Sequence, residues 1–157
     1  MTRFAVEAIG VVRSDRAAPI DDDWDAVESS IELDPEALEP EATLGLDGFS
    51  HIEVVYLFHL ADPSAACRGA RRPRGNPDWP MTGILAQRAK DRPNGIGVTV
   101  CRLLSVEGAE GRTLRVQGLD AIDGTPILDI KPYLSGFAPR GDVREPTWSL
   151  ELMAGYW

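Results

Sequence analysis

Short segments with the pattern of β-strands dominate the chain. They alternate apolar and polar positions or are rich in β-branched and aromatic residues, and they cover residues 4–14, 51–60, 95–108, 111–123 and 125–133. The turn-like run EGAEG separates the third segment from the fourth and predicts an antiparallel hairpin. Pro132 should end the last strand or place it at a sheet edge. Many short strands punctuated by glycine and proline favour a mainly β fold, either a small barrel or a sandwich.

The rest of the pattern predicts one long loop and one short helix. The loop, residues 63–80, is rich in arginine, proline and glycine and is longer than a simple connection needs, as functional loops often are. The helix is expected after Pro146, because Trp148, Leu152 and Tyr156 recur at every fourth position. This helix should seal one end of the core or, alternatively, contribute to a dimer interface.

Length and hydrophobicity limit the classes of protein to which this chain can belong. The 157 residues suffice for a single domain, 1–157, and no apolar run is long enough to span a membrane. No secretory signal pattern opens the chain, so we expect a cytoplasmic protein that does not engage a membrane.

The net charge of −9 argues against a nucleic-acid partner, but the charges are unevenly distributed. Basic residues concentrate in residues 67–94, which either form a basic face that attracts an anion or are merely a solvated loop. Acidic residues concentrate in residues 21–41, which we expect to be a solvated, flexible insertion.

A cluster of cationic and amide side chains precedes the third strand segment. It consists of Arg88, Lys90, Arg92 and Asn94, followed by two glycines. Guanidinium groups suit carboxylates or phosphates, and glycine allows a ligand to approach the backbone closely. The cluster lacks the GK[ST] ending of a P-loop, so a nucleotide site of that type is not expected. His51 and His59 are spaced too far apart for a one-turn metal pair, so no metal site is expected either.

Five runs, taken in chain order, resemble one known family. They are IGVVRSD, LDGFSHIEVVYLFH, RRPRG, GILAQRAKDRPNGIGVTVCRLL and LDAIDGTPILDIKPY, and together they extend over nearly the whole chain. They resemble the TrmO/TsaA-like family of bacterial and archaeal proteins, and the last run is the most specific. The resemblance implies a small antiparallel β-barrel that uses S-adenosyl-L-methionine as methyl donor and acts as a homodimer. The activity it implies is N6-methylation of threonylcarbamoyl-adenosine at position 37 of tRNA, which makes tRNA a partner.

The resemblance also implies roles for individual residues. The cofactor would be held by Gln87, Arg88, Arg92, Asn94, Asp123, Gly124, Thr125 and Leu128. The catalytic residues would be Asp129, Lys131 and Tyr133, which should alternate onto one face of their strand. The substrate would contact Arg72, Arg74 and Lys90. Asp129 is the hypothetical base or the group that orients the acceptor; the alternative is a structural ion pair between Asp129 and Lys131.

The chain departs from the family pattern in ways that leave the acceptor open. Ala89 and Lys90 stand where the common motif has Ser-Pro, and Gly95 replaces a proline, which makes this loop less pre-set. The chain ends at Trp157, where some tRNA-acting members carry a further domain, so we expect little extra surface for tRNA. Two alternatives therefore remain: a methyltransferase of this fold that acts on a small molecule, and a module that binds S-adenosylmethionine without transferring its methyl group.

Overall fold

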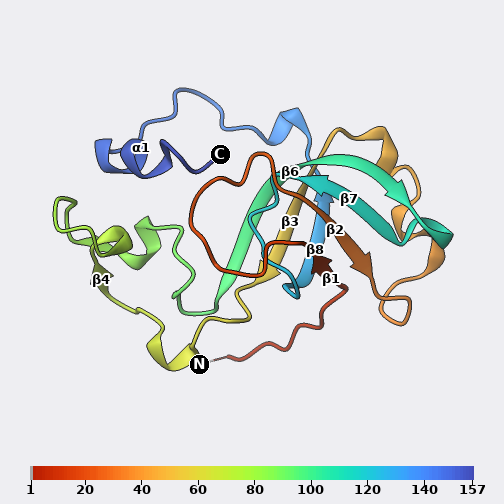
Figure 1. The fold of residues 1–157 in the computed structure, drawn as a ribbon, viewed down its shortest axis with the longest axis horizontal. Coiled ribbons are helices and arrows are strands. Elements are labelled where there is room, and N and C mark those ends of the chain that lie inside the picture. Colours follow the sequence, from red (N-terminus) through yellow and green to blue (C-terminus); the bar gives the residue numbers. More distant parts are fainter. Residues whose placement is uncertain (1) are drawn as a thin grey trace.

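The main body of the protein is a closed antiparallel β-barrel (Figure 1). The structure, a computed structural model, describes residues 2–157. The barrel strands are β1 (Gly10–Arg13), β2 (Glu28–Leu33), β3 (His51–Leu57), β6 (Ile96–Glu107), β7 (Thr113–Gln117) and β8 (Pro126–Pro132). Their order around the barrel is β1-β2-β7-β6-β3-β8, and β8 pairs with β1 to close it. The predicted mainly β fold, the barrel and the β6–β7 hairpin are confirmed.

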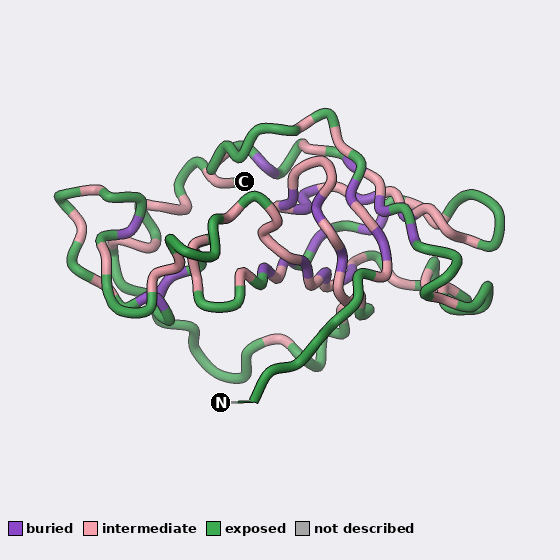
Figure 2. Tube along the Cα trace, turned by 90° about the horizontal axis from the view of Figure 1, so that it is seen from below, coloured by how far each residue is buried: buried purple, intermediate pink, exposed green. Residues whose placement is uncertain are grey.

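Alternating apolar positions along the strands fill the barrel. In β3, for example, Ile52, Val54 and Tyr56 point inward and are buried, whereas the residues between them are only half-buried. This is the period-two pattern of a strand with one face on a core. The buried core also includes Val12, Ile31, Leu33, Cys101, Leu103, Leu114, Val116, Leu119, Ala121 and Ile127. In Figure 2 the buried positions gather in the barrel, while the segments around it are mostly exposed.

The acidic segment is not a flexible insertion, and that prediction was wrong. Residues 28–33 form β2, which pairs with both β1 and β7 and is needed to close the barrel. Ile31 and Leu33 point into the core, while Glu28 and Glu32 face outward and pair with arginines of the neighbouring strands. The alternation in ESSIEL is that of a strand, and the surrounding acidic residues obscured it.

The first predicted strand is shorter than expected. β1 begins at Gly10, and residues 2–8 are exposed. Phe4 and Val6 alternate as strand residues do, but they are 87% and 70% exposed because no neighbouring element covers them. Alternation alone therefore overestimated the length of this strand.

The predicted C-terminal helix is present as α1 (Thr147–Met153). We expected this helix to seal one end of the barrel core, and that prediction was wrong. No residue of α1 is buried, and none belongs to the core cluster. The helix instead lies beside the arginine-rich loop (Figure 1), where the rings of Trp148 and Trp79 are 6.4 Å apart. Trp79 Nε1 also donates a hydrogen bond of 2.7 Å to Glu151. A contribution of α1 to a dimer interface stays a prediction.

The long loop between β3 and β6 has structure of its own. It contains a small hairpin, β4 (Ala70–Arg71) with β5 (Thr82–Gly83), which pairs apart from the barrel. Short 3-10 turns occur in this loop at Pro63–Ala65, Pro73–Gly75 and Ile84–Ala86, and elsewhere at Pro40–Thr43, Leu46–Gly48, Ala109–Gly111 and Ser135–Phe137. Pro73, Ile84 and Gln87 are buried within the loop, so it is packed rather than loose.

Gly97 is required by the packing inside the barrel. A Cβ atom at this position would lie 2.5 Å from Tyr56 Cζ and 3.0 Å from Phe58 Cζ, and both rings are fixed by their edge-to-face contact at 5.4 Å. We expect Gly97→Ala to lower the free energy of unfolding by about 1–3 kcal/mol, as overpacking of a core does. Urea unfolding measures this change. The control is Gly136→Ala, because nothing lies within 4 Å of a Cβ there. Equal stability of the two variants would contradict the packing argument.

Candidate functional site

Three loops gather at one end of the barrel, which we call the loop end. Because the strands are antiparallel, the connections β1–β2, β3–β6 and β7–β8 all leave from this end. Backbone hydrogen bonds tie two of them together: Asp123 N–H donates to Arg16 O at 2.9 Å, and Gly124 N–H donates to Val12 O at 2.9 Å. The third loop, β3–β6, reaches the same place through His59. A Cβ atom on Gly124 would lie 3.7 Å from His59 Nε2.

We call the whole connection between β3 and β6 the arginine loop. Its predicted binding residues between Gln87 and Asn94 mostly stabilise the loop itself. Gln87 is buried, and its Nε2 donates to Arg71 O at 2.9 Å and to Thr82 O at 2.7 Å. Arg92 Nη1 donates to Gln87 O at 2.9 Å. Lys90 is paired with Asp91 at 2.6 Å, and Asn94 is exposed. The loop therefore has a defined shape in which Arg92 keeps further guanidinium hydrogens for a ligand.

Arg88 caps a free strand edge. β6 pairs with β3 from Ile96 to Arg102 but with β7 only from Arg102 onward, so the first half of β6 extends past β7. Val98 lies in this half, and its carbonyl accepts a hydrogen bond from Arg88 Nη2. The side chain thus links the arginine loop to the barrel wall at the loop end.

The predicted cofactor residues before β8 line the same end. Asp123 Oδ1 accepts a hydrogen bond of 3.0 Å from Ser14 N–H, and Thr125 is buried. Gly124 has a φ of 76°, a conformation that favours glycine. Leu128 lies at an irregularity of β8, where the register with β3 shifts between Ile127 and Asp129. These residues shape the start of β8 beside the arginine loop.

The three predicted catalytic residues lie outside the barrel. Asp129 and Lys131 stand opposite the outward-facing Val55 and Glu53 of β3, and Tyr133 N–H donates to His51 O at 3.0 Å. Asp129 and Lys131 form an ion pair, with side chains 47% and 60% exposed. From Asp129 to Tyr133 the chain advances about 13 Å along the strand, because each residue adds about 3.3 Å. The structure thus places Asp129 toward the loop end and Tyr133 away from it.

The predicted substrate-binding arginines are engaged within the chain. Arg74 makes a two-pronged contact with Asp22, at 2.7 and 3.1 Å, and lies 3.8 Å from Asp21. Arg72 Nη1 donates to the carbonyl of Trp79. The acidic segment therefore partly neutralises the arginine loop, which the two opposite charge runs in the sequence did not reveal.

A part-buried polar cluster at the loop end was missed by sequence reasoning. Tyr156, from the C-terminal tail, donates its hydroxyl to Asp120, and Tyr56 and Thr99 hydrogen-bond at 3.2 Å inside the barrel. Burial raises the pKa of Asp120 to about 6, although the Tyr156 hydrogen bond and the charges of Arg88 and Arg16 oppose this. Asp120 belongs to the run LDAIDG, so the motif contained this residue, but its partner lies 36 residues away.

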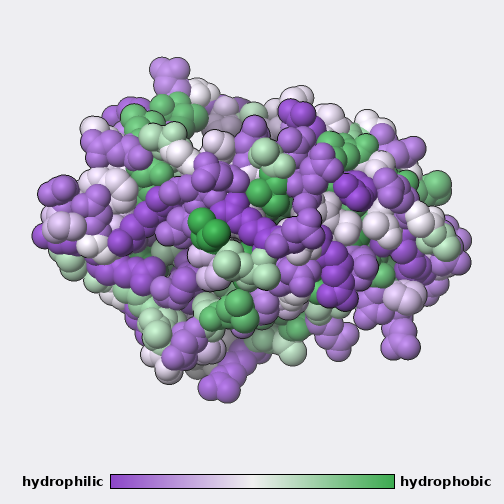
Figure 3. Space-filling view, viewed as in Figure 1, coloured by the Kyte–Doolittle hydropathy of each residue, from purple (hydrophilic) through white to green (hydrophobic). Residues whose placement is uncertain are grey.

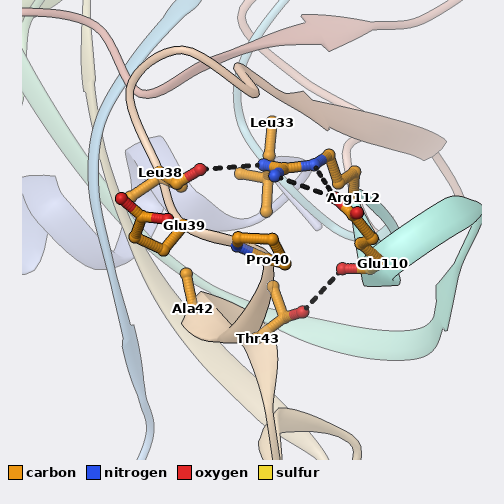
Figure 4. Close-up of a pocket in the computed structure, with 8 residues that line it drawn as sticks. All are labelled: Leu33, Leu38, Glu39, Pro40, Ala42, Thr43, Glu110 and Arg112. Carbon is orange, nitrogen blue, oxygen red and sulfur yellow. Dashed lines mark hydrogen bonds and ion pairs between the residues drawn. The ribbon is translucent and has the colours of Figure 1, made fainter.

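The opposite end of the barrel has a narrow crevice whose polar groups satisfy one another (Figure 4). Arg112 donates to Leu38 O at 3.2 Å and pairs with Glu110 at 3.0 Å, and Thr43 donates to Glu110 O. This pattern indicates a structural contact between the β6–β7 turn and the segment after β2. Within residues 2–157, no group of three or more His, Cys, Asp or Glu side chains is placed to hold a metal ion.

The loop end offers chemistry for a ligand that carries several kinds of group. Guanidinium groups bind carboxylates, a buried carboxylate suits a cationic group, and a glycine backbone permits close approach. Arg88, Asp120 and Gly124 supply these features on neighbouring loops. The face shown in Figure 3 is largely hydrophilic with scattered apolar side chains. Of residues 2–157, none belongs to a helix that is long and apolar enough to cross a bilayer.

Comparisons with known proteins agree with these features. Residues 11–138 match the family model of the tRNA-methyltransferase O N-terminal domain. A probable S-adenosyl-L-methionine-binding protein of Methanothermobacter thermautotrophicus is 40% identical over 135 residues, covering 82% of this chain and 88% of that protein. A tRNA (adenine(37)-N6)-methyltransferase of Escherichia coli is 33% identical over 140 residues, covering 85% and 59%.

A solved structure has the same fold. The crystal structure of TrmO from Pseudomonas aeruginosa superposes with a TM-score of 0.72 at 33% identity, over 91% of this chain and 61% of that one. The chain thus spans most of the archaeal relative but only about three fifths of the Escherichia coli enzyme and of the solved chain.

Proposed function

The chain belongs to the tRNA-methyltransferase O N-terminal domain family, and from this membership we propose that it is an S-adenosylmethionine-dependent methyltransferase acting on N6 of threonylcarbamoyl-adenosine at position 37 of tRNA. One observation carries the proposal: the family match extends over residues 11–138, which include all three loops of the loop end and every barrel strand except the first residue of β1. Relatives named as tRNA (adenine(37)-N6)-methyltransferases support the substrate.

The loop end fits S-adenosylmethionine. When bound, this molecule supplies a methyl group carried on a sulfonium cation. Arg88 and Arg92 would bind its carboxylate. Its adenosine would be bordered by Asp123, Gly124, Thr125 and the Leu128 backbone. Asn94 would contact the cofactor from the arginine loop, and Gln87 would maintain the conformation of that loop. The part-buried carboxylate of Asp120, close enough to Arg88 for their charges to interact, gives the cationic ligand a complementary charge. The positive charge of Arg88, the negative charge of Asp120 and the accessible backbone of Gly124 therefore support binding of this ligand at the loop end.

Asp129 would act on the acceptor. The acceptor nitrogen is a poor nucleophile until its proton leaves, and a half-exposed carboxylate can take up that proton. Lys131 would fix the local charge beside the Asp129 carboxylate through their ion pair, and Tyr133 would give the acceptor a hydrogen-bonding or stacking wall. Alignment of the acceptor against the methyl group would supply much of the remaining rate enhancement.

The tRNA would be held by the arginine loop of two subunits. Arg72, Arg74 and Lys90 lie on this loop and are exposed, so they can reach phosphates once their internal partners yield. The outer face of β6 exposes Ile96 and Leu104 to 40% and 41%, which suits burial against a second copy in a homodimer. A tRNA substrate would also place the protein in the cytoplasm.

The Arg74–Asp22 contact gives a direct test of tRNA binding. We expect Asp22→Asn to raise the affinity for tRNA several-fold, because it frees Arg74 for a phosphate. The slope of log affinity against log salt should steepen by about 0.7–0.9, the value for one further phosphate contact. Binding measured from 50 to 300 mM salt gives this slope. Asp47→Asn, at the other end of the barrel, is the control, and identical slopes for the two variants would exclude Arg74 from the tRNA surface.

A second candidate is binding of S-adenosylmethionine without tRNA methylation. It is favoured by the length of the chain, which spans 88% of an archaeal relative named only as a probable S-adenosyl-L-methionine-binding protein. The test is incubation of the purified protein with labelled S-adenosylmethionine and tRNA that carries threonylcarbamoyl-adenosine. Label in the tRNA supports the first function. Cofactor binding with unlabelled tRNA supports the second or a small-molecule acceptor.

A further inference from the structure

The first half of β6 borders a cavity of about 170 Å³ on the side of the barrel. Its lining comes from five places in the chain: the β1–β2 loop, β3, β6, β7 and the C-terminal tail. The side chains that matter for its chemistry are Asp25, His51, Val100, Arg102, Gln117 and Trp157. The mechanism proposed above assigns no role to any of them.

The cavity results from the step between β6 and β7. Arg102 stands opposite Gln117, the last residue of β7, so β7 does not reach the half of β6 before Arg102. The chain then turns away at Gly118, which has a φ of 75°. Val100 therefore lies on a strand edge that no neighbouring strand covers, and the C-terminal residue Trp157 forms the opposite wall. Such an edge presents backbone donors and acceptors as well as side chains.

Trp157 is held in place by the residues before it. The hydroxyl of Tyr156 donates to Asp120, and the Tyr156 carbonyl accepts a hydrogen bond of 2.9 Å from Trp24 N–H. Gly155 O accepts a hydrogen bond of 3.0 Å from Asp23 N–H. The Tyr156 and Trp157 rings meet edge to face with centroids 5.0 Å apart. The aromatic wall is thus pre-organised, which lowers the entropy lost when a ligand binds.

The lining suits a neutral planar ring with a polar edge. Asp25 and Arg102 carry opposite charges, so an anion alone would meet repulsion from Asp25. Gln117 offers an amide, and His51, whose Nδ1 lies 2.8 Å from Ser50 Oγ, offers a second ring nitrogen. Trp157 supplies a face for stacking. The volume is below the roughly 300 Å³ at which pockets for drug-sized ligands begin, so the cavity suits a single ring system rather than a whole nucleotide.

We infer that this cavity binds one unstacked nucleobase of the RNA substrate, stacked on Trp157 and hydrogen-bonded at its edge by Gln117 and Arg102. Proteins read single-stranded RNA by stacking splayed bases on aromatic side chains and bonding their edges. The inference rests on the proposed function, which makes RNA the substrate. The position of the cavity agrees with this inference. Tyr133, the proposed wall for the acceptor, donates its N–H to O of the lining residue His51 at 3.0 Å, so the cavity adjoins the end of β8.

Nucleoside titration tests the cavity without any catalytic step. Protein labelled with ¹⁵N at its four tryptophans is titrated with cytidine, and with adenosine in the presence of saturating S-adenosylhomocysteine, while the indole signals are followed by NMR. We expect the Trp157 signal, assigned by its loss in Trp157→Phe, to shift saturably. The Trp148 signal should not move, and ribose alone should shift neither. A Trp157 signal that stays constant, or that moves no more than Trp148, overturns the inference.

Two variants connect the cavity with tRNA. Stacking on an aromatic residue is worth about five- to hundredfold in binding, so Trp157→Leu should raise the KM for tRNA by about tenfold with a smaller change in kcat. Arg102→Gln should act in the same direction. The matched controls are Trp148→Leu and Arg115→Gln, since Arg115 lies on β7 but pairs with Glu28 outside the cavity. Thermal melts confirm that each variant folds.

The outcomes separate this inference from the proposed function. If cytidine shifts Trp157 but no tRNA accepts a methyl group, base binding stands and the proposed reaction fails. If tRNA is methylated while Trp157 is silent and both cavity variants match their controls, the cavity inference fails alone.

Discussion

Asp129→Asn is expected to lower the rate constant of methyl transfer by roughly 10²- to 10⁴-fold, the usual contribution of a positioned general base. The fold should survive, because the Asp129–Lys131 ion pair is about half exposed and such pairs contribute only about 0–1 kcal/mol to stability. Single-turnover kinetics with tRNA measures the rate constant, and calorimetry measures the affinity for S-adenosylmethionine, which should remain within about twofold since Asp129 acts on the acceptor.

Two further variants separate catalysis from structure. Glu53 faces outward from β3 opposite Lys131, so Glu53→Gln removes a neighbouring carboxylate from the same surface and should leave the rate close to wild type. Lys131→Gln breaks the ion pair but keeps the carboxylate, and should retain more activity than Asp129→Asn. If Asp129→Asn transfers methyl groups normally while still binding the cofactor, Asp129 is not the base and the ion pair is only structural.

Asp120→Asn is expected to stabilise the protein at neutral and alkaline pH. Burial raises the pKa of Asp120 from 3.8 to about 6, so the folded state favours its protonated form. Stability from this preference is fully present below pH 4 and is lost as the pH rises through 6. Above pH 7 the ionised carboxylate opposes folding by up to about 3 kcal/mol, given about 1.4 kcal/mol for each pKa unit. Asparagine removes this penalty and can still accept the Tyr156 hydrogen bond.

Urea unfolding between pH 4 and pH 8 measures the effect. The difference between Asp120→Asn and wild type should be near zero at pH 4 and reach its maximum above pH 7. Asp142→Asn, a change at an exposed carboxylate, should leave stability unchanged throughout. A difference that is constant with pH, or a variant less stable than wild type at pH 8, would show that the pKa of Asp120 is not raised by the fold.

Much of the barrel could be predicted because its strands alternate cleanly. β3 and β7 bury every second residue, as does β6 from Ile96 to Leu104, and this period is visible in the sequence. β2 has the same alternation, but charged residues on its outer face and around it made the segment resemble a solvated insertion. Local charge density is a poor guide to strand structure when one face of the strand is exposed, because only the inner face must be apolar.

The site was predictable only where its residues share a motif. Asp123, Gly124 and Thr125 are adjacent in sequence, and the loop before β8 keeps them together. The Asp120–Tyr156 hydrogen bond and the Arg74–Asp22 pair join segments 36 and 52 residues apart. Such contacts depend on how the tail and the acidic loop pack against the barrel, and no periodicity or spacing encodes that packing.

The central claim is that this protein methylates N6 of threonylcarbamoyl-adenosine at position 37 of tRNA. Nucleoside mass spectrometry on bulk tRNA from cells with and without the gene tests it most directly. We expect the N6-methyl form to disappear without the gene, to return with the wild-type gene, and not to return with the Asp129→Asn variant. An unchanged profile, in cells with no second family member to compensate, would contradict the tRNA assignment and favour a small-molecule acceptor.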